Sequence, residues 1–161
     1  MAKNKDHLVV VLAVDQSEHS EFTFKWYINN IHRPDNILHI VHVPEVPGDL
    51  SKVMTASVKV QEITEAARHK IDTIKDNYLE WAFQNGIPEA KFANPHGSEP
   101  WHEIVTYAEK VGAGLIVIGS RGQGKLKRTI LGSVSDSVLH HSDIPVLICR
   151  SKDSNSVIVS H

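Results

Sequence analysis

The sequence has few of the features that mark a secreted, membrane or nucleic-acid-binding protein. Its single cysteine is Cys149, so no disulfide can form within the chain, which fits a reducing compartment. No apolar run approaches the length of a transmembrane helix, and no small-residue cleavage site follows the apolar residues 8–14. The 17 Lys and Arg nearly balance the 19 Asp and Glu, so no global charge attracts nucleic acid or an acidic membrane surface. We therefore expect a soluble cytoplasmic protein that binds neither nucleic acid nor membranes.

The sequence instead alternates short apolar runs with amphipathic segments. Such runs are typical of strands buried on both faces, and they lie at residues 8–14, 37–43, 115–118 and 145–149, with a weaker strand at 90–94. Apolar spacings of three and four residues between the runs predict helices. We expect Ser17 and Ser98 to cap two of these helices, and Gly86 and Gly112 to end two of them.

This alternation predicts an α/β fold. We expect a single-domain, doubly wound, five-stranded parallel sheet with strand order 3-2-1-4-5 and helices on both faces. The domain should occupy residues 1–150, with a loop at 44–57 and a polar tail at 151–161. Ligands of such sheets bind outside the carboxyl ends of the strands, where the winding reverses. The informative residues should therefore follow the first, second and fourth strands.

The residues after the fourth strand read GSRGQGKLKRTILGS and contain four glycines and four cations. A phosphate-binding P-loop is disfavoured, because Leu126 stands where Ser or Thr should bind magnesium. A dinucleotide fingerprint is disfavoured as well, because Lys127 occupies the position of the third glycine. A simple strand-to-helix turn would explain Gly119 and Ser133, but not the other glycines together with the charge.

A third pattern fits better. Gly119, Gly122 and the Gly132-Ser133 pair have the spacing G-x2-G-x9-G-S, which resembles the glycine motif of the ATP-binding branch of the universal stress protein family. The resemblance extends to the sequences AVD at 13–15, HV at 42–43, LIVIGSRG at 115–122 and GSVSDSVLHHSDIPVLI at 132–148. It covers roughly residues 8–150, and Gly114 departs from it, because many relatives carry an acidic residue there.

The resemblance implies roles for individual residues in binding ATP, with magnesium possible beside the nucleotide. Glycines allow positive φ angles and let backbone amides approach an anion. The phosphates would pass over Gly132 and meet the hydroxyl of Ser133 and the amides of a helix start. Asp15 would bind a ribose or help hold a metal, and Val43 would offer its backbone to adenine. The expected site comprises Asp15, Val43, Gly119, Arg121, Gly122, Gly132, Ser133, Val134 and Ser135, with Lys125, Lys127 and Arg128 adding charge.

Other chemistry is weakly indicated. His39 and His42 should point to opposite faces of one strand, and His140 and His141 should diverge on a helix, so we expect no histidine metal site. Cys149 lies in an apolar strand and is expected to be an inert core residue.

The resemblance implies a nucleotide-dependent sensor or adaptor in the stress response, paired as a homodimer through strand 145–149. No nucleophile–base pair stands out, so catalytic residues are not expected. Two alternatives stay open. One is an enzyme that uses adenine nucleotides, through slow ATP hydrolysis or chemistry at the α-phosphate. The other is a ligand-free dimeric interaction module.

Overall fold

The computed structural model describes residues 7–44, 57–121 and 131–151, with side chains from residue 64 onward in the middle range. Gly122 and three of the four cations of the glycine motif (Lys125, Lys127 and Arg128) therefore lie outside the described residues, as do residues 45–56 of the expected loop and the tail beyond 151.

Five parallel strands form one sheet in the order β3-β2-β1-β4-β5, as the sequence predicts. The strands are β1 (Val9–Ala13), β2 (Ile37–Val41), β3 (Lys91–Ala93), β4 (Leu115–Gly119) and β5 (Val146–Cys149). Leu12 in the central strand pairs with Ile40 on one side and Val117 on the other. The winding reverses at β1, so the carboxyl ends of β1 and β4 diverge into opposite layers of helices.

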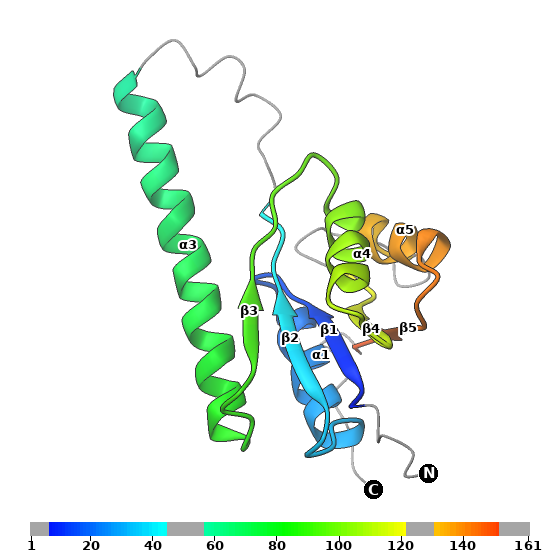
Figure 1. The fold of residues 1–161 in the computed structure, drawn as a ribbon. Coiled ribbons are helices and arrows are strands. Elements are labelled where there is room, and N and C mark those ends of the chain that lie inside the picture. The colour runs from blue at the N-terminus through cyan, green and yellow to red at the C-terminus, as the bar shows by residue number, and fades with distance from the viewer. Residues whose placement is uncertain (1–6, 45–56, 122–130, 152–161) are drawn as a thin grey trace, which may run out of the picture.

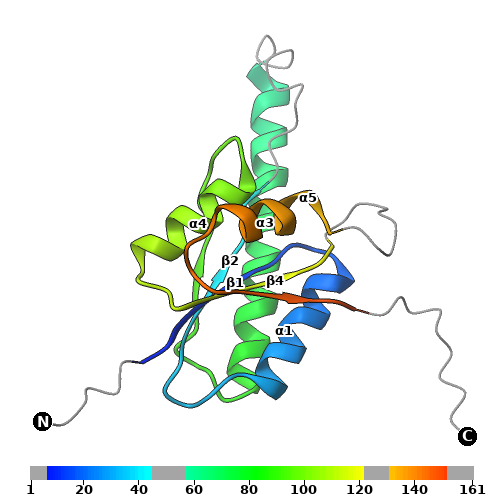
Figure 2. The same cartoon turned by 90° about the vertical axis from the view of Figure 1, so that its right-hand side faces the viewer.

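The helices cover both faces of the sheet (Figures 1 and 2). They are α1 (Glu18–Asn30), α3 (Ser57–Gln84), α4 (Pro100–Lys110) and α5 (Ser133–His141). Side chains of α1 and α3 share one buried cluster, and side chains of α4 and α5 share another on the opposite face. Figure 2 shows α1 and α5 on opposite sides of the strands β4 and β5.

The helix ends follow local sequence signals, with one correction. Ser17 caps α1 by accepting a hydrogen bond from the Ser20 amide, and Gly86 and Gly112 have φ angles of 79° and 67°. The prediction that Ser98 caps α4 is wrong, because the N-cap is Glu99. A residue before proline avoids the helical conformation, so Glu99 stays extended and α4 begins at Pro100.

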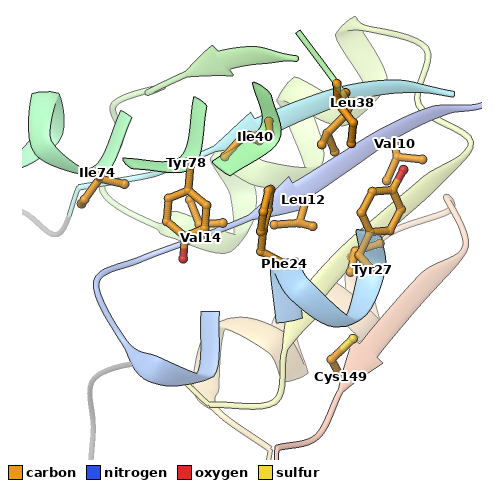
Figure 3. Close-up of a cluster of buried hydrophobic side chains, with 13 residues drawn as sticks. Val10, Leu12, Val14, Phe24, Tyr27, Leu38, Ile40, Ile74, Tyr78 and Cys149 are labelled. Carbon is orange, nitrogen blue, oxygen red and sulfur yellow. The ribbon is translucent and has the colours of Figure 1, made fainter. Parts of the chain in front are cut away.

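Figure 3 shows the core beneath α1 and α3. In it the rings of Phe24 and Tyr78 pack edge-on, with their centroids 5.4 Å apart. Cys149 belongs to this cluster, as expected, and burial raises the pKa of its thiol. Among the residues of α3 from 64 onward, Ile74, Tyr78 and Ala82 are buried, whereas residues 64–70 are exposed. Figure 1 shows why: this part of α3 continues beyond the carboxyl ends of the strands, where no sheet lies beneath it.

Candidate functional site

A cleft of about 540 Å³ opens at the carboxyl ends of β1, β2 and β4. The expected site residues that line it are Asp15, Val43, Gly119, Arg121, Gly132, Ser133, Val134 and Ser135. The ninth expected residue, Gly122, lies outside the described residues. Segments more than 100 positions apart in the sequence therefore meet in one cavity, at the place where the sheet topology predicts a ligand.

Asp15 is held by the turn that joins β1 to α1. Its Oδ1 accepts a 2.7 Å hydrogen bond from the Ser17 amide, and its own amide donates to Oγ of Ser20 at 2.9 Å. The hydroxyl of Tyr78 on α3 donates to the Asp15 carbonyl at 3.4 Å. Asp15 thus has a structural role at the helix start, and its carboxylate is also positioned at the cleft wall.

The end of β2 forms the cleft floor. The His42 amide donates to the Ala93 carbonyl at 3.0 Å, and Nδ1 of His42 lies 2.9 Å from the Val14 carbonyl oxygen. His39 instead contacts the hydroxyl of Tyr107, on the face of the sheet that α4 covers. The His42 contact ties the end of β2 to the end of β1 just before Val43 and Asp15.

The glycines in the cleft correct one part of the sequence argument. Neither Gly119 nor Gly132 has a positive φ angle. At each position, neighbouring atoms leave little space for a side chain. A Cβ atom at Gly119 would lie 3.0 Å from Oγ1 of Thr23. Glycine is therefore favoured at these two positions because a side chain would crowd neighbouring atoms, not because the backbone is left-handed.

The start of α5 presents free backbone donors to the cleft. Gly132 is the N-cap, and the first amide to bond back within the helix is that of Asp136, which donates to the Gly132 carbonyl at 2.9 Å. The amides of Ser133, Val134 and Ser135 come before it and lack intrahelical acceptors. Such a helix start carries partial positive charge, which favours an anion.

The two serines at this helix start have different surroundings. Ser135 is buried, and its hydroxyl donates to the carbonyls of Gly132 at 3.0 Å and Ser120 at 3.3 Å. It therefore fixes the turn, and only its amide is available to a ligand. Ser133 is exposed, is not the N-cap, and lines the cleft.

Sequence reasoning missed the walls that α3 and α4 contribute. Ala67, Lys70 and Ile71 line the cleft from α3, and Pro100 and Ile104 line it from α4. A length argument would have found the first group. A helix of 28 residues is about 42 Å long, whereas a strand of 5 residues spans about 17 Å, so α3 must overhang the sheet.

Within the described residues, no three His, Cys, Asp or Glu side chains come together as a metal site would require. None of the helices in the same ranges combines the length and apolarity needed to cross a bilayer.

The family model of the universal stress protein family matches residues 8–150 of the chain. Universal stress protein YxiE of Bacillus subtilis is 33% identical over 147 residues, which cover 88% of this chain and 97% of that protein. The solved structure of hypothetical protein MJ0577 has a TM-score of 0.77 at 24% identity and covers 92% of this chain and 99% of its own.

Two other solved structures share the fold and contain nucleotides. A universal stress protein in complex with cAMP has a TM-score of 0.64 at 20% identity, covering 91% of this chain and 98% of its own. The universal stress protein from Archaeoglobus fulgidus in complex with dAMP has a TM-score of 0.58 at 22% identity, covering 88% and 97%. Sequence and fold agree, and the chain belongs to the universal stress protein family.

Proposed function

We propose that the chain is an ATP-binding universal stress protein that acts as a nucleotide-dependent sensor or adaptor. The observation that carries the proposal is the shared cleft: the free amides at the start of α5 lie in the same cavity as Asp15 and Val43. These are the donors, ribose partner and base partner that a nucleotide needs. The adenine nucleotides bound by two relatives of the same fold support the choice of ligand class.

In this proposal the phosphates lie against α5, because its start offers three unbonded amides and a small N-cap residue. The ribose lies toward Asp15 and the base toward the end of β2. Arg121 lines the cleft beside Gly119 and adds positive charge, and a magnesium ion could accompany the phosphates.

Thermal unfolding with and without nucleotide tests the proposal. A ligand present at 100 times its Kd stabilises the folded state by ~2.7 kcal/mol. For a domain of this size we expect ATP with magnesium to raise Tm by about 5–10 °C, and GTP to raise it much less. Native mass spectrometry of gently purified protein should detect bound adenine nucleotide. An unchanged Tm up to millimolar ATP would reject nucleotide binding.

The same proposal includes a homodimer formed through β5. This strand ends the sheet, and its residues Val146, Leu147 and Ile148 are only partly buried. An apolar edge strand favours pairing with another chain, and pairing with its own copy closes the assembly symmetrically.

A further inference from the structure

Tyr78 links helix α3 to the turn that holds Asp15. Its side chain is buried and does not line the cleft, so it has no direct contact with a ligand there. Its hydroxyl donates to the Asp15 carbonyl at 3.4 Å. The other two described hydrogen bonds of Asp15 join it to Ser17 and Ser20, which belong to the same turn and the start of α1. Tyr78 therefore supplies the contact that ties this turn to a second helix.

The ring of Tyr78 is fixed by the aromatic residues around it. It packs edge-on against Phe24 and Trp81, with centroid distances of 5.4 and 5.1 Å. In Figure 3 the hydroxyl points out of the buried cluster, on the side of the turn between β1 and α1. Burial, followed by the negative charges of Asp15 and Glu21, raises the pKa of Tyr78. The hydroxyl therefore stays protonated at neutral pH and remains a donor.

The carboxylate of Asp15 has one oxygen available to a ligand. Oδ1 accepts from the Ser17 amide, and among the described residues Oδ2 has no hydrogen-bond or ion-pair partner. The position of Oδ2 is therefore set by the turn. The peptide group that joins Asp15 to Gln16 is planar, so a contact that holds its carbonyl also fixes the backbone next to the carboxylate. Without the Tyr78 donor this peptide group could rotate, and the carboxylate would shift with it.

We propose that Tyr78 is a positioning residue for the sugar of the bound nucleotide, because its hydroxyl holds the turn in which Oδ2 of Asp15 accepts from a ribose hydroxyl. This inference rests on the proposed nucleotide function, in which Asp15 binds the ribose. A carboxylate oxygen can only accept, and a ribose hydroxyl can donate. The phosphates bind at the start of α5, away from this contact. The effect of Tyr78 should therefore be confined to the sugar.

Isothermal titration calorimetry with ATP and with inorganic tripolyphosphate, at equal magnesium, tests the proposal. Tyr78→Phe removes the hydroxyl and keeps the packing of the ring. This variant should bind ATP about fivefold more weakly, which is the effect of losing one hydrogen bond. Tripolyphosphate has no ribose and should bind to the variant with unchanged affinity. A general loosening of the core would weaken the binding of both ligands.

A double variant tests whether Tyr78 acts through Asp15. Asp15→Asn keeps an oxygen for the Ser17 amide and replaces the other oxygen with an amino group, which cannot accept a hydrogen bond. ATP binding should weaken in this variant, and adding Tyr78→Phe should cause no further loss. When tripolyphosphate binds too weakly to be measured, this comparison decides instead.

Tyr27→Phe is the matched control. Tyr27 belongs to the same buried cluster as Tyr78, and its hydroxyl lies 3.0 Å from Nδ1 of His32. This contact lies near the end of α1, whereas Asp15 precedes its start. Tyr27→Phe should leave the affinity for ATP unchanged. Thermal unfolding of both Phe variants without ligand measures any loss of stability separately from binding.

Three outcomes would overturn the inference: unchanged ATP affinity in Tyr78→Phe, an equal loss for tripolyphosphate, or an equal loss of ATP affinity in Tyr27→Phe. A further loss on adding Tyr78→Phe to Asp15→Asn would show that Tyr78 acts by another route, and would also overturn it. If the unaltered protein does not bind ATP, the proposed nucleotide function itself fails. Equal ATP binding by the unaltered protein and by Tyr78→Phe rejects only the role of Tyr78.

Discussion

The amide of Gly132 donates a 2.7 Å hydrogen bond to the Ser120 carbonyl, and a Cβ atom at Gly132 would lie 3.2 Å from that same oxygen. The turn from β4 into α5 is therefore closed by direct backbone contact. This contact makes Gly132 structurally constrained before any ligand is present.

Gly132→Ala should consequently destabilise the protein even without nucleotide. Crowding of this kind costs about 1–3 kcal/mol, and we expect a lower Tm of the ligand-free variant. A larger residue such as valine should disrupt the turn further, so loss of binding in Gly132→Val would not by itself locate the phosphates. Unchanged stability of Gly132→Ala in urea unfolding would show that the turn relaxes to admit the methyl group.

Ser133→Asp separates phosphate binding from stability. Ser133 follows the N-cap, and a carboxylate in the first turn of a helix stabilises it by about 0.3–1 kcal/mol. We expect the ligand-free Tm to be unchanged or higher, while the Tm increase caused by ATP disappears because the carboxylate repels the phosphates. In Ser133→Asn the new side chain has nearly the same size as aspartate but no charge, so this variant should retain ATP binding. Normal ATP affinity in Ser133→Asp would place the phosphates elsewhere.

The stability of the protein should fall as the pH drops below the ordinary histidine pKa. His39 is buried, its Nδ1 lies 2.8 Å from the Tyr107 hydroxyl, and its pKa is lowered from 6.5, first by burial and then by Lys91. The unfolded chain therefore takes up a proton that the folded chain resists. The contribution of neutral His39 to the free energy of unfolding should be complete above pH 6.5. It should be lost as the pH falls from there through the lower pKa of the folded state.

Urea unfolding at pH 7.5 and pH 5.5 measures this decline. The pKa of His32 is also lowered by burial, so His39→Asn should remove only part of the difference between the two conditions. Equal pH dependence in the variant and the unaltered protein would contradict the assignment to His39.

The proposed dimer predicts a mass near 36 kDa in solution, twice the chain mass of 17.9 kDa. Light scattering or sedimentation at tens of micromolar should report it, because the edge of β5 is the place for symmetric pairing. Val146→Lys should shift the protein toward monomer. Val146 also packs against the cluster beneath α4 and α5, so the Tm of the variant protein must be measured in parallel. A monomeric unaltered protein at these concentrations would exclude the dimer.

The sequence predicted what local chemistry decides. The four apolar runs and the weaker segment at 90–94 form the five strands, and Gly86 and Gly112 adopt the left-handed conformation that ends helices. The residues expected at three strand ends converge because parallel strands present their carboxyl ends at one edge. These features depend on neighbours in sequence or on the general topology of parallel sheets.

The missed features depend on distant neighbours. The apolar period of α3 does not reveal where the sheet beneath it stops, so Ala67 and Ile71 could not be separated from Ile74 by spacing alone. The small space at Gly132 is set by Ser120, which no local pattern indicates. Ser135 matched the expected site, yet its hydroxyl serves the turn, and only coordinates distinguish those two roles.

The overhang of α3 also divides one helix into two regions with different local unfolding free energies. The region that contains Ile74, Tyr78 and Ala82 is anchored in the core, so its amides should exchange with solvent only through extensive unfolding. Residues 64–70 lack such contacts, and their amides should exchange through local opening of the helix. A ligand that packs on Ala67 and Ile71 would stabilise the closed form of this region. Ligand binding in the cleft would then make residues 64–70 of α3 more stably helical. Because these residues are exposed, another protein could recognise the ordered helix and so distinguish the ligand-bound from the ligand-free state.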